Sequence, residues 1–200
     1  MSNIVRISNK ILRIGGKIVN DLTPYTPPPE PPHFDPTIVE VQIGDQIWMA
    51  NDLNGTDGGE GVSQSGSSYS YTYNAAVRLA EQVDGWRLPT FDDYYQLYQY
   101  VSEVRGSTST GVLFESLATV NGWMNTGPSY RNFTGFNGTP EYISFTQQAY
   151  VRYWYTRTSD MNSFAMGQTK DTGGGIYGYA NLATTKNTST YIKVRLIKDN

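Results

Sequence analysis

The side chains that catalysis requires are scarce in this sequence. Its single histidine, His33, lies in a proline-rich stretch, and because the chain contains no cysteine, thiolate nucleophiles, disulfides and cysteine metal sites are excluded. A Ser-His-Asp arrangement would have to use His33, and no GxSxG turn is present. The segment GGGIYG (residues 173–178) matches GxGxxG, but no parallel βαβ unit is expected around it. We therefore expect no catalytic residues, no cofactor and no enzymatic activity.

Oxygen ligands for a metal ion form only a weak candidate site. Asp57 and Glu60 lie in the glycine- and serine-rich segment NGTDGGEGVSQSGSS (residues 54–68). Calcium needs about six to eight oxygen ligands, and two carboxylates in a polar loop are more simply solvated. Calcium binding is possible there, but we expect no metal site.

Aromatic and polar side chains offer a different chemistry, which is the binding of a ligand. The chain has 16 Tyr and 20 Gly and only 16% charged residues, a composition typical of contact surfaces. Tyr and Trp rings can stack on the apolar face of a sugar or anchor a protein epitope. We expect the contact residues in the loop-like stretches, namely Tyr130, Arg131, Asn132, Arg157, Asp160, Asn162, Tyr177, Tyr179 and Asn181.

The charge and the hydropathy pattern restrict the classes of partner. With 15 basic and 18 acidic residues and a net charge of −3, the chain has no basic footprint for a phosphate backbone or anionic lipid. No apolar run approaches the roughly 18 residues that a membrane-spanning helix requires. The N-terminal stretch MSNIVRISNKILRIGGKIV lacks the continuous apolar segment of a secretion signal. We expect no nucleic-acid binding, no membrane insertion and no signal peptide.

Two elements are expected ahead of the main domain. Residues 4–19 alternate apolar and polar side chains around Gly15-Gly16, which predicts a β-hairpin. Because an isolated hairpin is marginal in water, the segment 1–23 is expected to pair with its own copies or with a partner protein. Prolines then dominate residues 24–36 and predict a semi-rigid linker.

The main domain is expected over residues 37–200. Its first segment, TIVEVQIGDQIWM, predicts two strands around the Gly44-Asp45 turn. The stretch YNAAVRLAEQV predicts a first short helix. In GWRLPT (residues 85–90), Thr90 is a helix N-cap with Asp93 as its capping-box partner, so a second helix begins at Phe91. That helix is expected to bury the stripe Tyr94, Leu97, Tyr98, Val101 and Val104.

Beyond Gly106 the pattern favours strands. A turn is possible over residues 113–120, and the remainder reads as short strands punctuated by glycine. Two helices followed by a β-rich half indicate an α+β fold. The residues expected in the structural core are Trp48, Trp86, Arg87, Leu88, Pro89, Trp123 and Trp154.

An ordered set of motifs carries a family resemblance. The segments IGDQIWMANDL, YNAA, GWRLPT with its helix, LATVNGWMN, GFNG, YWYTRTS and VRLIKD resemble, in this order, the Fibrobacter succinogenes major paralogous domain (FISUMP) family. The likeness covers about residues 37–199. It implies a C-type-lectin-like fold, here with two helices and short antiparallel strands.

The chain also departs from that family. FISUMP members usually carry two cysteines, whose places correspond to Val83 or its neighbours and to Leu196, so the implied disulfide is missing. The related formylglycine-generating enzymes need active-site cysteines, so the resemblance to them implies the fold only. The Glu-Pro-Asn and Trp-Asn-Asp motifs of calcium-dependent lectins are missing as well.

Together these expectations describe a fibre-type protein that reaches the outside of the cell as part of a virus particle. We interpret the chain as a bacteriophage virion surface protein, a head or tail fibre or decoration, assembled in the host cytoplasm and displayed on the virion surface. Residues 1–23 would bind a capsid or tail protein, and the head would bind a host-surface glycan or protein. A homo-oligomer, expected to be a trimer, would add avidity. The alternatives are a purely structural decoration without an external ligand and a bacterial FISUMP-type surface protein.

Overall fold

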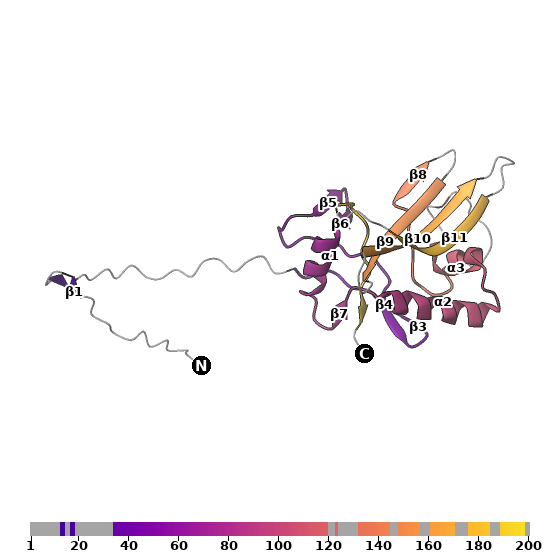
Figure 1. Ribbon diagram of the computed structural model, residues 1–200, viewed down its shortest axis with the longest axis horizontal. Coiled ribbons are helices and arrows are strands. Elements are labelled where there is room, and N and C mark those ends of the chain that lie inside the picture. The colour runs from indigo at the N-terminus through magenta and orange to yellow at the C-terminus, as the bar shows by residue number, and fades with distance from the viewer. Residues whose placement is uncertain are drawn as a thin grey trace. The chain divides into compact units, whose positions relative to one another are not determined.

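The chain divides into two compact units, Met1–Pro31 and Pro32–Asn200. The computed structural model describes residues 13–14, 17–18, 34–119, 123, 132–144, 148–156, 161–170, 176–184 and 189–198. In the first unit these are two strands, β1 (Arg13–Ile14) and β2 (Lys17–Ile18), which pair antiparallel. The pairing predicted on either side of Gly15-Gly16 is thus confirmed. The second unit, described over residues 34–198, is called the body below (Figure 1).

One small sheet of the body is built from segments that lie far apart in the sequence. Its strand order is β3-β4-β12-β7, and the turn between β3 and β4 uses Gly44 at φ 61°, as the sequence predicts. A separate hairpin, β5-β6, follows β4 in the chain. The bounds are β3 (Glu40–Ile43), β4 (Gln46–Met49), β5 (Val62–Ser65), β6 (Ser68–Tyr71), β7 (Trp86–Arg87) and β12 (Ile197–Lys198).

The second sheet is fully antiparallel, with the order β11-β10-β9-β8. Its strands are β8 (Tyr142–Ser144), β9 (Gln148–Thr156), β10 (Met161–Lys170) and β11 (Ile176–Thr184). The expectation of short strands is wrong here, because β9, β10 and β11 are 9, 10 and 9 residues long. Gly167 and Gly178 lie within β10 and β11. These positions require glycine, because aromatic rings fill the space that a side chain would need.

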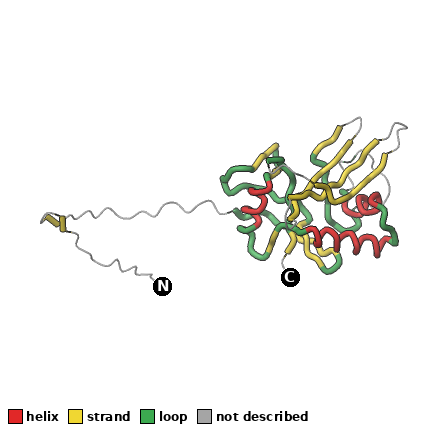
Figure 2. Tube along the Cα trace, viewed as in Figure 1, coloured by secondary structure: helices red, strands yellow, loops and turns green. Residues whose placement is uncertain are grey.

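The helices are α1 (Tyr73–Ala80), α2 (Phe91–Arg105) and α3 (Thr110–Leu117). The predicted start of α2 is confirmed, with a complete capping box between Thr90 and Asp93. Helix α3 corrects the expectation of two helices. Its N-cap residue Ser109 makes no side-chain cap, so the local signal is weak, and packing of Phe114 against Gly178 of β11 stabilises it. Figure 2 shows α1 at one end of the body and α2 with α3 at the other.

Two apolar clusters fill the body, which is an α+β fold. The first joins α2 and α3 to the face of the β8–β11 sheet that packs against them, and the second surrounds α1 and includes Ile192, Val194 and Leu196 of the segment before β12. All four tryptophans are buried, at 0%, 8%, 5% and 0% exposure for Trp48, Trp86, Trp123 and Trp154. Val104 corrects the predicted stripe, because it is 48% exposed and lies in the last turn of α2, beyond the core.

The described part of the body begins at Phe34. Phe34 is only 3% exposed, and Pro36 is buried too, so the end of the proline-rich segment belongs to the second apolar cluster. Within the described ranges, no helix is long and apolar enough to cross a membrane.

Candidate functional site

The segment around the last strand places a charged side chain in the centre of the body. Arg195 is 1% exposed, and its Nε and Nη2 atoms donate to Asp52 Oδ1 at 3.0 and 2.8 Å. Nη2 also donates to the Asn137 carbonyl oxygen at 2.8 Å. Burial alone would lower the pKa of Arg195, but Tyr153 and Asp52 outweigh it and raise that pKa, so the guanidinium stays charged.

Aromatic rings enclose this ion pair. The guanidinium carbon of Arg195 lies 4.4 Å from the ring centroid of Phe136 and 5.1 Å from that of Tyr153, within cation–π range. Lys193, the neighbouring cation on the same segment, has a side chain that is 6% exposed, with its Nζ 3.8 Å from Asp52 Oδ2. Two cations therefore share one carboxylate inside the body.

Four of the sequence motifs contribute residues to this cluster. Asp52 comes from IGDQIWMANDL, Phe136 and Asn137 from GFNG, Tyr153 from YWYTRTS, and Arg195 from VRLIKD. The Arg195 side chain is 1% exposed, whereas that of Asp52 is 18% exposed. A buried charge of this kind needs its partners in place to offset the loss of hydration.

Three buried polar atoms near the cluster have no hydrogen-bond partner among the described residues. They are the hydroxyls of Tyr94 and Tyr153 and the Nη1 atom of Arg195. Burial raises the pKa of both tyrosines, so both hydroxyls stay protonated. The Asp52 charge adds to this effect at Tyr153, although the two groups form no hydrogen bond of normal length.

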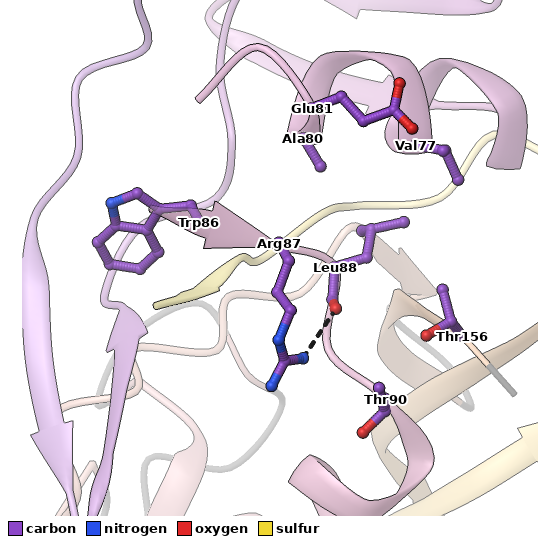
Figure 3. A pocket seen from close by; sticks show the side chains of 8 residues that line it. All are labelled: Val77, Ala80, Glu81, Trp86, Arg87, Leu88, Thr90 and Thr156. Carbon is purple, nitrogen blue, oxygen red and sulfur yellow. Dashed lines mark hydrogen bonds between the residues drawn. The ribbon is translucent and has the colours of Figure 1, made fainter. Parts of the chain in front are cut away.

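GWRLPT borders an open, mostly apolar pocket of about 290 Å³ (Figure 3). Val77 and Ala80 of α1 face Leu88 across it. The other lining residues are Glu81, Trp86, Arg87, Thr90 and Thr156.

The charged side chains at this pocket are those of Arg87 and Glu81. Arg87 is already bound, since its Nη1 lies 2.6 Å from Asp93 Oδ2 and donates to the Leu88 carbonyl oxygen at 3.2 Å. Arg87 also departs from the expected core set, because its side chain is 39% exposed. Glu81 is then the one carboxylate among the lining residues, and it has no acid–base partner there.

In the glycine-rich loop, the Asp57 carboxylate binds side chains of the body itself. Asp57 Oδ2 lies 2.7 Å from Arg78 Nε and accepts from Gln82 Nε2 at 2.9 Å. Hydrogen bonding from Arg78 holds the pKa of Asp57 well below its usual range. Its oxygens are therefore occupied by donors from Arg78 of α1 and from Gln82, just beyond that helix. No group of three or more His, Cys, Asp or Glu side chains that could hold a metal occurs in the described part of the chain.

The β8–β11 sheet presents a second face, called the outer face here, that is turned away from α3. Tyr179 alternates with Gly178, which packs against Phe114 of α3, so Tyr179 lies on the outer face. The register places Tyr150 of β9 and Tyr179 of β11 on either side of Gly167. The guanidinium carbon of Arg152 lies 5.3 Å from the Tyr150 ring centroid. Sequence reasoning missed Tyr150 and Arg152, whose alternation in QAYVRYWYT is the signal that could have found them.

The structure brings part of the expected contact set together. Tyr177, Tyr179 and Asn181 occupy alternate positions of β11. Asn162 is not brought to them, because its position on β10 belongs to the opposite face of the sheet. Asn132 is used inside a turn, where its Oδ1 accepts from the Asn137 backbone N–H at 2.8 Å. The expected contact residues Tyr130, Arg131, Arg157 and Asp160 lie outside the described residues, as does His33.

The outer face is the candidate surface for the binding of a ligand. In comparisons with known proteins, no protein-family model, no curated protein and no solved structure matches the chain.

Proposed function

We propose that the chain is a bacteriophage virion surface protein whose body is a C-type-lectin-like head that attaches the particle to its host. The outer face is the observation that carries this proposal. Tyr150, Arg152 and Tyr179 are held on the solvent side of a long-stranded antiparallel sheet. Rings and a cation on a rigid support suit recognition without chemical conversion of the ligand.

The division into two compact units supports the fibre part of the proposal. In it, residues 1–23 bind a capsid or tail protein, the proline-rich residues act as a spacer, and the body contacts the host. Three copies on one particle would turn weak single contacts into stable adhesion.

The attachment role is tested on phage particles whose genome encodes the chain. Particles without it are expected to assemble and to adsorb poorly to their host, with adsorption restored when purified full-length chain is incorporated. Normal adsorption without the chain would refute the attachment role, and fragile particles that still adsorb would favour the purely structural decoration. Detection of the chain on bacteria but never on particles would favour the bacterial surface protein.

The anchor is tested by deletion of residues 1–23. The shortened chain is expected to stay off the particle while its body remains folded, as measured by circular dichroism. If it is incorporated as well as the full chain, the anchor lies elsewhere.

The FISUMP-like arrangement of the body has its own test. Val83 and Leu196, which the resemblance places where the family has cysteines, pack against the same apolar cluster. We expect the double variant Val83→Cys and Leu196→Cys to form an intramolecular disulfide under oxidising conditions, detected by the mass of the non-reduced protein. Two free thiols in a folded protein would count against the resemblance.

A further inference from the structure

The centre of the outer face lies between tyrosines of β9 and β11. Strand β10 contributes Ala165 and Gly167 to this face, and both are small. At Gly167 the Tyr179 hydroxyl oxygen lies 2.5 Å from the position that a Cβ atom would occupy. The Tyr179 ring therefore lies across the glycine and reaches toward Tyr150, which is the register partner of Gly167 on the other side. Only glycine leaves room for this arrangement.

The strand register adds a further tyrosine to this row and defines the row of residues next to it. Tyr142 of β8 is the partner of Tyr150, so three tyrosines and one glycine form a row across four strands. In the adjacent row Arg152 is the partner of Ala165, which is the partner of Asn181. The row next to the tyrosines therefore contains Arg152 on β9 and Asn181 on β11.

Arg152 carries a charge that no described carboxylate neutralises. Its guanidinium contacts the Tyr150 ring, and Glu141 interacts with it only at a distance, without an ion pair. The residue is partly buried. This contrasts with Arg78, Arg87 and Arg195, each of which binds an aspartate. A partly desolvated guanidinium without a described hydrogen-bond partner is well suited to a planar anion such as a carboxylate.

The tyrosine rings indicate that the rest of the ligand is a sugar. Tyrosine faces bind the apolar C–H surface of a pyranose ring, and their hydroxyls supply polar contacts at its edge. A phosphate group alone would use the cation and leave the rings without a partner. A neutral sugar would use the rings and leave the cation without one.

We propose that the outer face binds a carboxylate-bearing sugar, with Arg152 holding the carboxylate and the rings of Tyr150 and Tyr179 contacting the pyranose. This inference names the ligand class for the attachment role and rests on that proposed function. Because one arginine and two rings give modest affinity, the contact depends on several copies acting together.

The test uses purified full-length chain on a printed panel of oligosaccharides that end in glucuronic acid or N-acetylneuraminic acid. Each glycan is printed beside its methyl ester, which keeps the ring and removes the negative charge. We expect the acids to bind at least roughly tenfold better than the esters. Equal binding to acids and esters would overturn the role of Arg152.

Variants locate the site. Arg152→Gln is expected to lose at least roughly tenfold in apparent affinity for the acids, and Arg152→Lys to keep part of it, because lysine retains the charge but not the planar fork. Arg105→Gln, in the last turn of α2, is the matched control and should bind like the parent protein. Thermal unfolding by circular dichroism confirms that each variant is folded.

Binding to host cells separates this inference from the attachment role. If the chain binds cells, and both the parent and Arg152→Gln bind equally well after sialidase or glucuronidase treatment, the ligand class is wrong and the attachment role stands. Loss of cell binding after protease treatment alone would point to a protein receptor and also overturn the ligand class. A chain that binds neither cells nor any printed glycan would overturn both.

Discussion

Arg195 and Arg152 are residues of one type in different surroundings. Arg195 is enclosed by Phe136 and Tyr153 and paired with Asp52, so its charge stabilises the interior and is inaccessible to a ligand. Arg152 lies on the outer face with one ring contact and no described ion pair. Their sequence neighbourhoods, YVRYW and KVRLI, share the pair Val-Arg followed by apolar or aromatic residues. Burial and partners, which come from distant segments, decide their roles.

At the scale of single residues, Tyr94 carries a buried hydroxyl with no described partner, while its ring stacks on Phe164 at 4.4 Å. We expect Tyr94→Phe to leave the free energy of unfolding unchanged or to raise it by about 1 kcal/mol, because an unpaired buried hydroxyl is itself unfavourable. Urea denaturation followed by tryptophan fluorescence measures the difference.

The matched control is Tyr71→Phe. The Tyr71 hydroxyl donates to the carbonyl oxygens of Leu53 and Gly55 at 3.2 and 3.0 Å, so its loss should cost about 1–3 kcal/mol. If Tyr94→Phe is as destabilising as the control, the Tyr94 hydroxyl has a partner in solution, such as an internal water.

At the scale of elements, the start of α2 couples a helix cap to an ion pair. Asp93 accepts from the Thr90 backbone N–H at 2.6 Å and from Arg87 Nη2 at 3.0 Å. Burial alone would raise the pKa of Asp93, but the hydrogen bonds from Arg87 and Thr90 hold it below the ordinary value. One carboxylate thus fixes both the helix start and the strand before it.

That lowered pKa gives the body a pH dependence. The folded protein holds the Asp93 proton less tightly than the unfolded chain, so this stabilisation is complete above about pH 4 and is lost as the pH falls through the folded pKa. Asp93→Asn should cost about 1–3 kcal/mol at pH 7 and flatten the decline in acid. Chemical denaturation between about pH 2 and pH 7, the range that contains the ordinary pKa values of carboxylates, measures both effects.

Asp92→Asn is the control, because Asp92 is an exposed carboxylate of the same helical turn. It should retain the acid-dependent decline of the parent protein. If Asp93→Asn shows the same decline as Asp92→Asn, Asp93 does not govern the acid response. Asp57, whose pKa Arg78 also lowers, contributes in the same direction and limits how far the decline can flatten.

Helix α3 depends on one glycine of the neighbouring sheet. A Cβ atom at Gly178 would lie 2.3 Å from the Phe114 ring, whereas one at Gly111, inside α3, would meet only ordinary contacts at 3.4 Å or more. Gly178→Ala should therefore destabilise by about 1–3 kcal/mol, and Gly111→Ala should stabilise by about 0.5–1 kcal/mol. Thermal unfolding of both variants measures these changes, and effects of the same sign would contradict this account of α3.

At the scale of the whole molecule, the body has its own core and starts before the segment that sequence patterns assign to it. Phe34 is buried and contacts Gly55, where a Cβ atom would lie 3.0 Å from the Phe34 ring. A chain that begins at Pro32 is expected to unfold at the same denaturant concentration as the full chain. One that begins at Thr37 should be less stable by about 3–5 kcal/mol, the usual cost of removing a buried phenylalanine.

Denaturation of the three chains at equal concentration provides the comparison. Phe34→Ala in the full chain is the control and should lose as much stability as the chain that begins at Thr37. Equal stability of the Thr37 and Pro32 chains would show that the proline-rich segment is dispensable for the body.

The sequence by itself determined what short-range chemistry controls. The turn at Gly44, the cap at Thr90, helices α1 and α2 and the α+β class follow from signals that act within a few residues. The tertiary structure alone decided the rest. Arg195 meets Asp52 across 143 residues of chain, α3 forms against β11, and Tyr150, Arg152 and Tyr179 become neighbours only through strand register. Contacts of this kind depend on which distant segments pack together, and local patterns do not encode that choice.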